Sequence, residues 1–234
     1  MDICRISLLG AGKTGSFVAE LCEKREDIKL SIFDSKNPLT QTDLKNSDVV
    51  ISFLTGEVFQ QYIDLLLSSP TPVVTGSTGF DFPSDIDTTL KDLNTTWVHA
   101  TNFALGMSLV KQMIEVLAQG RQLFAADNIS QHIHEVHHTQ KKDAPSGTAL
   151  SWHSWAGSHG EITSAREGDV IGDHELVFET PFERITLKHE AKNRRVFAEG
   201  ALWAALELHR HPDRYQKGLL DIHQMTRLTT QGKK

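Results

Sequence analysis

Apolar residues in the first hundred positions form short runs, separated by segments with helical spacing. Runs of strand length occupy positions 6–9, 28–33, 48–53 and 72–75. Helical spacing recurs between them, first at Phe17, Val18, Leu21 and Cys22 and later at Phe59, Ile63, Leu66 and Leu67. Strands that alternate with helices in this way predict a parallel sheet that is covered on both faces. The polar segment 36–47 is short for another helix and strand, so we expect a trimmed sheet there.

The second half has a different spacing of apolar positions. Apolar spacing predicts a long helix over 103–118, and alternation with period two predicts a strand over 128–138. On that strand His132 and His134 should share a face with His138, while His137 points the other way. We expect a helix from Thr148, a polar loop over 164–174 and a hairpin of strands 174–180 and 184–191. A last long helix should begin near Phe197 and run through Leu208.

The composition is that of an ordinary globular chain. It has 234 residues, 39% of them hydrophobic and 23% charged, with a net charge of −6. With this charge and no basic run interleaved with aromatics, we expect no nucleic-acid partner. No apolar run reaches membrane-spanning length, so we expect no membrane partner and a cytoplasmic protein. Cys4 and Cys22 lie on apolar faces, which indicates buried, reduced thiols.

A glycine-rich motif directly follows the first predicted strand. It reads Gly10-Ala11-Gly12-Lys13-Thr14-Gly15 and leads into a helical pattern. Strand, G-x-G-x-x-G and helix is the order that binds the pyrophosphate of a dinucleotide in a Rossmann fold. Asp34 ends the second strand, where an acid normally bonds the adenosine ribose. Lys36 could instead contact a 2′-phosphate, so both NADH and NADPH remain open.

The segment 134–150 gathers the groups that can carry chemistry. His137 and His138 can exchange protons near neutral pH, and Lys141 can hold an anion or supply a proton. The turn Asp143-Ala144-Pro145-Ser146-Gly147-Thr148 opens the next predicted helix, where backbone N–H groups attract carboxylates and phosphates. The same stretch contains the zinc-protease pattern H-E-x-x-H, from His134 to His138. That interpretation needs a helix, which the strand-like alternation disfavours, and we expect no metal.

The motif His137-His138-x-x-Lys141-x-Asp143-Ala144-Pro145-Ser146-Gly147-Thr148 resembles the signature of the bacterial dihydrodipicolinate reductases, also called 4-hydroxy-tetrahydrodipicolinate reductases. The resemblance implies an α/β fold with a Rossmann-like nucleotide-binding domain (1–101 and 212–234) and an α+β sheet domain for substrate and oligomerisation (102–211). It also implies NADH- or NADPH-dependent reduction of a cyclic imine dicarboxylate in lysine and diaminopimelate biosynthesis, by a homotetramer.

The resemblance also implies roles for individual residues. His137 would donate a proton with help from Lys141, and the distal carboxylate would bind to His138, Ser146, Gly147 and Thr148. Besides the glycine loop and Asp34, the cofactor would contact two further segments at its nicotinamide end, namely Gly76, Ser77 and Thr78, and Ala100, Thr101, Asn102 and Phe103.

Several positions depart from the family pattern. The family's loop usually reads G-x-x-G-x-M-G, whereas here the first glycine comes one place later and Thr14 replaces Met. Ser77, Thr101 and Ala104 replace Thr, Pro and Ser. Two other functions compete with the reductase: another two-domain NAD(P) dehydrogenase, such as one acting on aspartate, and a redox sensor that binds the nucleotide without catalysis. The anion-binding turn after a histidine pair disfavours both.

Overall fold

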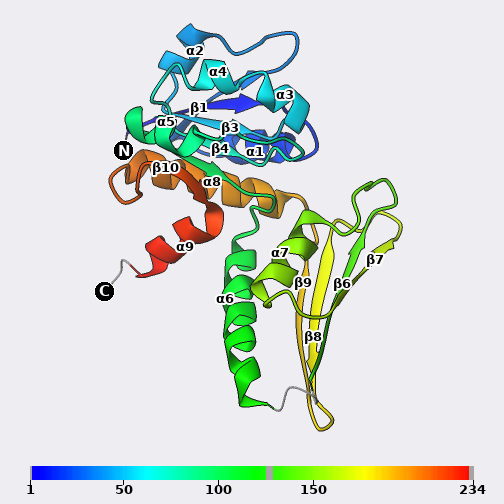
Figure 1. The fold of residues 1–234 in the computed structure, drawn as a ribbon. Helices are drawn as coiled ribbons and strands as arrows, with labels where there is room; N and C mark the ends of the chain where they lie inside the picture. Colours follow the sequence, from blue (N-terminus) through cyan, green and yellow to red (C-terminus); the bar gives the residue numbers. More distant parts are fainter. Residues whose placement is uncertain (1, 125–128, 232–234) are drawn as a thin grey trace. The chain divides into compact units, whose positions relative to one another are not determined.

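The computed structural model describes residues 2–124 and 129–231. The chain divides into two compact units, one of residues 1–105 and 194–234 and one of residues 106–193 (Figure 1). No helix in the described ranges is long and apolar enough to cross a membrane.

The described residues of the first unit form a six-stranded parallel sheet in the order β10-β5-β4-β3-β1-β2. The strands are β1 (Cys4–Leu9), β2 (Ile28–Phe33), β3 (Val49–Ser52), β4 (Val73–Thr75), β5 (Thr96–His99) and β10 (Gly218–Asp221). The four apolar runs thus form strands, as predicted. The sequence pattern had not predicted β5, because its residues 96–99 mix Thr and His with Trp and Val.

Helices cover both faces of this sheet because neighbouring residues on the central strands point to opposite sides. Val49 and Ile51 contribute to one core and Val50 to the other. The first core packs α1 (Gly15–Glu23), α8 (Arg195–Arg210) and α9 (Ile222–Gln231). The second packs α2 (Gln41–Lys45), α3 (Gly56–Gln60), α4 (Ile63–Leu66) and α5 (Ile86–Asp92).

The expected trimming of the sheet is confirmed. Between β2 and β3 the chain forms only α2, and β2 is the edge strand of the sheet. Thr40 and Asp43 cap α2 reciprocally, through the Thr40 hydroxyl and the Asp43 carboxylate. The single helix expected around 59–67 is two helices, because Gln61 and Tyr62 donate to residues three positions back instead of four.

The second unit is a four-stranded sheet, ordered β7-β6-β8-β9, with α6 (Leu105–Gly120) and α7 (Gly147–Trp155) against one side (Figure 1). A short 3₁₀ turn, η1 (Arg121–Leu123), follows α6. The strands are β6 (Ser130–His137), β7 (Glu161–Arg166), β8 (Asp173–Glu179) and β9 (Arg184–Glu190). The predicted hairpin is β8 and β9. The prediction of a loop over 164–174 is wrong in part. Residues 164–166 belong to β7, which pairs parallel with β6. Asn128 lies outside the described residues.

The division into units differs from the predicted domain bounds at α8. The prediction placed residues 102–211 in the second domain, whereas α8 belongs to the first unit. Small residues of α8, among them Ala198, Ala201 and Ala205, are buried in the core beside α1 and β3. Gly200 lies so close to the Phe103 carbonyl that an added Cβ would be 1.7 Å from its oxygen. This packing fixes α8 to the sheet of the first unit.

Candidate active site

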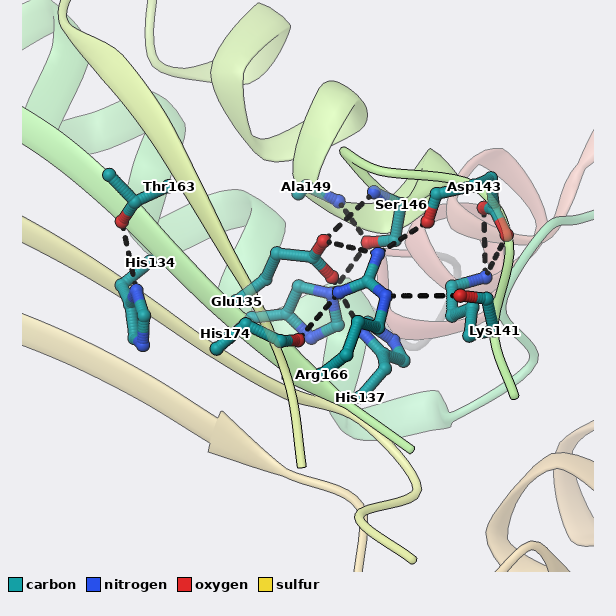
Figure 2. A network of polar contacts seen from close by, with 11 residues as sticks. His134, Glu135, His137, Lys141, Asp143, Ser146, Ala149, Thr163, Arg166 and His174 are labelled. Atoms are coloured by element: carbon teal, nitrogen blue, oxygen red, sulfur yellow. Dashed lines mark hydrogen bonds and ion pairs between the residues drawn. The ribbon is translucent and has the colours of Figure 1, made fainter. Parts of the chain in front are cut away.

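Strand β6 sorts its polar residues between two faces. Glu135 and His137 are buried on one face, at 0% and 7% exposure, and His134 is exposed on the other. Figure 2 shows His134 next to Thr163, where its Nδ1 lies 2.8 Å from the Thr163 hydroxyl. The zinc-protease interpretation is therefore wrong, since it needs a helix and the strand separates His134 from Glu135.

The Glu135 carboxylate is the centre of a buried polar network (Figure 2). Its Oε1 accepts the backbone N–H of Ser146 at 3.2 Å and Nη2 of Arg166 at 3.0 Å. Its Oε2 contacts Nδ1 of His137. A buried carboxylate is stable only with such partners. Glu135 therefore ties the histidine to the turn that precedes α7.

The charges in this network follow from the same contacts. Burial opposes ionisation of Glu135, but hydrogen bonds from Ser164, Ser146 and Arg166 and the charge of His137 hold its pKa at about 2. Burial lowers the pKa of His137, the negative charge of Glu135 opposes that, and the positive charges of Lys141 and Arg166 add to the lowering. His137 is therefore a partly desolvated imidazole next to a carboxylate that stays charged.

His174 on β8 supports the network as a neutral group. Burial, followed by the charge of His137, lowers its pKa to about 3. Its Nε2 lies 3.1 Å from the Ser146 hydroxyl, and its ring packs against His137 and Trp152. With Glu135 and His137, it forms a group whose nitrogen and oxygen atoms are spaced as metal ligands can be. Arg166 and the Ser146 N–H already bind Glu135 and leave it a poor metal ligand. The arrangement therefore favours proton transfer over metal binding.

The turn after β6 places backbone N–H groups at the start of α7. Ser146 caps α7, and its hydroxyl accepts the Ala149 N–H at 3.2 Å. The N–H groups of Gly147 and Thr148 then lie in the first turn of α7, where a helix provides donors and a positive dipole end. Ser146 is buried, and its N–H and hydroxyl contact Glu135, His174 and Ala149, which fixes the shape of the turn. Its predicted contact with the substrate carboxylate stays a prediction.

Arg166 and Lys141 hold the loop between β6 and the turn. The Arg166 guanidinium donates to the Lys141 carbonyl through Nε at 3.3 Å and to the Asp143 carbonyl through Nη2. The Lys141 ammonium lies 2.8 Å from both Asp143 carboxylate oxygens, and its side chain is 23% exposed. Burial opposes ionisation of Asp143, but the hydrogen bonds and charge of Lys141, a backbone hydrogen bond and the charge of Arg166 together keep the pKa of its carboxyl below the usual value. Lys141 is therefore a positioned cation that a ligand can still reach.

In the first unit, the glycine motif forms an open cradle at the start of α1. Gly10 has φ +85°, and a Cβ on Gly15 would lie 1.9 Å from the Gly10 carbonyl, so neither position admits a side chain. A Cβ on Gly12 would meet nothing within 4 Å, so the backbone there is open to a ligand. Thr14, the N-cap of α1, makes no side-chain capping bond. Residues 10–15 therefore fit a pyrophosphate.

Asp34 follows β2 and is exposed. Its Oδ1 accepts the backbone N–H groups of Lys36 and Asn37 at 2.8 and 2.9 Å. These bonds, from Asn37 first and then Lys36, lower its pKa, so the carboxylate is charged at neutral pH. The bonds fix the carboxylate through Oδ1.

The segments predicted for the nicotinamide end are held by their neighbours in the first unit. The Ser77 N–H donates to the Thr75 hydroxyl at 3.2 Å, and Nε2 of His99 lies 3.0 Å from the Ser77 carbonyl. The Asn102 amide oxygen accepts the Ala104 N–H at 2.9 Å. Phe103 is buried with its ring against Phe53. Thr78 and Thr101 are exposed, Gly76 is half-buried and Ala100 is buried.

Sequence reasoning gave no role to three members of the buried polar network: Glu135, Arg166 and His174. A signal existed for Glu135, because it lies two residues before His137 on a strand and must share its face. No local signal existed for Arg166 or His174, because only the pairing of β7 and β8 with β6 brings them to the site.

Fold and site together define a class, the two-domain oxidoreductases with a Rossmann-like domain. Two family models match consecutive parts of the chain: "Dihydrodipicolinate reductase, N-terminus" over residues 4–103 and "Dihydrodipicolinate reductase, C-terminus" over residues 104–225. The chain belongs to the dihydrodipicolinate reductase family.

Named relatives agree with this assignment. The 4-hydroxy-tetrahydrodipicolinate reductase of Rickettsia bellii is 35% identical over 229 residues, which cover 88% of this chain and 89% of the relative. That of Acidiphilium cryptum is 36% identical over 203 residues, which cover 76% and 80%.

Solved structures share the fold. The dipicolinate-bound dihydrodipicolinate reductase of Paenisporosarcina sp. TG-14 has a TM-score of 0.73 at 20% identity, covering 94% of this chain and 97% of that one. The aspartate dehydrogenase of Thermotoga maritima has a TM-score of 0.51 at 12% identity, covering 88% and 96%. The latter likeness shows a common architecture and gives no support to aspartate as substrate.

Proposed function

We propose that this protein reduces the cyclic imine dicarboxylate 4-hydroxy-tetrahydrodipicolinate, or the dihydrodipicolinate derived from it, to tetrahydrodipicolinate in lysine and diaminopimelate biosynthesis. The observation that carries the proposal is the site of the second unit. A buried His137–Glu135 pair lies on the strand that leads into Lys141 and the N-terminus of α7, in a chain of the reductase family. Oxidation of reduced nicotinamide in the presence of enzymatically generated substrate tests it.

The residues of the second unit suit the two demands of this reaction. The substrate brings carboxylates, and the N–H groups at the start of α7, with His138 and Thr148, would hold the distal one. The C=C–C=N system must gain a hydride and a proton. When bound, a reduced nicotinamide supplies the hydride and becomes oxidised. His137 would donate the proton to the electron-rich enamine, and the Lys141 ammonium would stabilise the negative charge that develops.

The first unit would hold the nucleotide. The cradle of residues 10–15 would bind the pyrophosphate, Asp34 the adenosine ribose, and residues 76–78 and 100–103 the nicotinamide end. The open backbone at Gly12 and the start of α1 support this assignment. Asp34 favours NADH, because a charged carboxylate accepts ribose hydroxyls and repels a 2′-phosphate.

Replacing Asp34 by alanine should weaken NADH binding by about tenfold or more and leave NADPH binding nearly unchanged or improved. The reason is the loss of charge-assisted hydrogen bonds to ribose hydroxyls, worth roughly 1.5–3 kcal/mol. Titration of each nucleotide into the purified variant measures this. Asp43→Ala is the control, since Asp43 caps α2 in the same unit. An unchanged NADH affinity would remove Asp34 from the site.

We also propose a homotetramer assembled through the sheet domain. Its support is an apolar stripe of Leu109, Met113 and Val116 along α6, which are 61%, 46% and 68% exposed. The edge strand β9 is also exposed over most of its length. Light scattering on the eluting protein should give about four times the 26.1 kDa mass of the chain. A monomeric mass at micromolar concentration would contradict the assembly.

A further inference from the structure

We propose that Glu135 is a positioning residue of the reductase: it fixes the proton-donating His137 with Nε2 toward the substrate, and joins that histidine to the carboxylate-binding turn. The assignment of His137 as proton donor rests on the proposed function. The position of Glu135 and its contacts are features of the second unit alone.

The first observation is the contact with the ring. Glu135 and His137 are two residues apart on β6 and so share its buried face. Oε2 of Glu135 pairs with Nδ1 of His137. A carboxylate at Nδ1 keeps a proton on that nitrogen, so the proton that is exchanged must be the one on Nε2.

The second observation concerns the opposite side of the ring. Nε2 of His137 faces Gly172, the residue before β8, where an added Cβ would lie 3.0 Å from Nε2. Gly172 has no side chain, so it does not crowd that nitrogen. The carboxylate therefore anchors one ring nitrogen, and the missing side chain at Gly172 leaves space beside the other.

The third observation is that the same carboxylate reaches the turn. Oε1 of Glu135 accepts the Ser146 N–H at 3.2 Å, while the Ser146 hydroxyl caps α7. Nη2 of Arg166 also binds Oε1, at 3.0 Å. A displacement of Glu135 would therefore move the proton donor and the start of α7 together. Positioning of this kind matters because catalysis is sensitive to shifts of about 1 Å.

The charges around His137 make the effect of Glu135 measurable. Lys141, from the loop after β6, and Arg166, from the end of β7, both disfavour a second proton on the ring. His174 on β8 packs against the ring and is neutral, and His189 of β9 lies beyond it. Asp143 offsets part of the Lys141 charge. Glu135 is the carboxylate that opposes these cations. Its removal should lower the pKa of His137 below the value in the wild type.

The experiment compares Glu135→Gln with the wild type in two measurements. One is the pH dependence of kcat/KM at saturating nucleotide, and the other is an NMR titration of the His137 ring. A proton donor must be protonated, so activity falls as pH rises through its pKa. Loss of the Glu135 charge should lower the pKa at which activity falls by about one unit or more. The pKa of the His137 ring in the NMR titration should fall by the same amount. At pH 7.5, kcat/KM should fall about tenfold or more, with nucleotide affinity unchanged.

Glu161→Gln is the matched control, because Glu161 is exposed on β7 in the same sheet and undergoes the same change of charge. Its pH profile and titration should equal those of the wild type. A Glu135→Gln protein whose His137 titrates as in the wild type overturns the proposal, even if its activity or stability is lower. Glu135→Asp keeps the charge, so the pKa of its pH–activity profile should stay within a few tenths of a unit of the wild-type value.

Two readouts keep this inference separate from the proposed function. If the wild type reduces no substrate, the proposed function fails, and the NMR titration still decides whether Glu135 controls His137. If Glu135→Gln does not fold, the wild type alone decides. A slowly exchanging, downfield Nδ1 proton that disappears in His137→Gln supports the carboxylate contact, and a His137 ring protonated on Nε2 alone contradicts it.

Discussion

Replacing His137 by glutamine should lower kcat by about 10²- to 10⁴-fold and leave the affinity for reduced nicotinamide within about twofold. The loss is that expected for removing a positioned general acid. Glutamine keeps a polar group of similar reach and provides no proton of suitable acidity. Nucleotide affinity should persist, because the glycine cradle and Asp34 lie in the other unit of the chain. Steady-state kinetics with enzymatically generated substrate, combined with nucleotide titration, measures both quantities.

His134→Gln is the control for this variant. His134 lies on the same strand but on its exposed face, bonded to Thr163. It should retain nearly full activity. If the two variants lost similar, small amounts of activity, His137 would not be the proton donor.

Replacing Lys141 by alanine should impair both turnover and substrate binding. The Lys141 side chain lies beside the turn and is 23% exposed, so its ammonium can reach an incoming carboxylate or a developing charge. Losing a hydrogen bond to a charged group costs about 1.5–3 kcal/mol, which corresponds to about a 10- to 100-fold change. We expect a change of that order in KM for the substrate, together with a fall in kcat.

Lys142→Ala is the matched control, because Lys142 is the next residue and is exposed. The Lys141 variant removes the counter-ion of Asp143. Because the Asp143 side chain is 58% exposed, this loss should cost little stability. A Lys141→Ala enzyme with unchanged KM and kcat would show that the lysine only fastens the loop through Asp143.

The first unit was largely predictable because its signals are local. The continuous apolar run at 48–53 contains β3, which is covered on both faces. The run at 28–33 became the edge strand β2, and the glycine motif precedes α1 as expected. β5 lacked such a run. Its residues Trp97 and Val98 supply one side chain to each core, so the sheet around them determines their conformation.

The second unit was predicted less completely because its site depends on pairing between distant segments. Arg166 reaches Glu135 only because β7 pairs parallel with β6, and residues 164–166 had been expected in a loop. His174 reaches the Ser146 hydroxyl across the pairing of β8 with β6. The residues that could be named from sequence, such as His137 and Lys141, lie within one continuous motif.

The domain bounds show the same limit. The sequence predicted the long helix from about Phe197 to Leu208, but not the sheet against which it packs. Ala201 and Ala205 allow α8 to approach the sheet of the first unit closely, and a pattern of small residues cannot tell which of two sheets it will contact.

One measurement tests the central claim, reduction of the cyclic imine dicarboxylate, most directly. Dihydrodipicolinate synthase, pyruvate and aspartate semialdehyde generate the substrate in place, and the oxidation of NADH and NADPH is followed separately after this protein is added. We predict oxidation that requires the synthase, with NADH used at least as well as NADPH because of Asp34. A folded protein that binds either nucleotide yet oxidises neither under these conditions would contradict the claim, and would favour a different substrate or a nucleotide sensor.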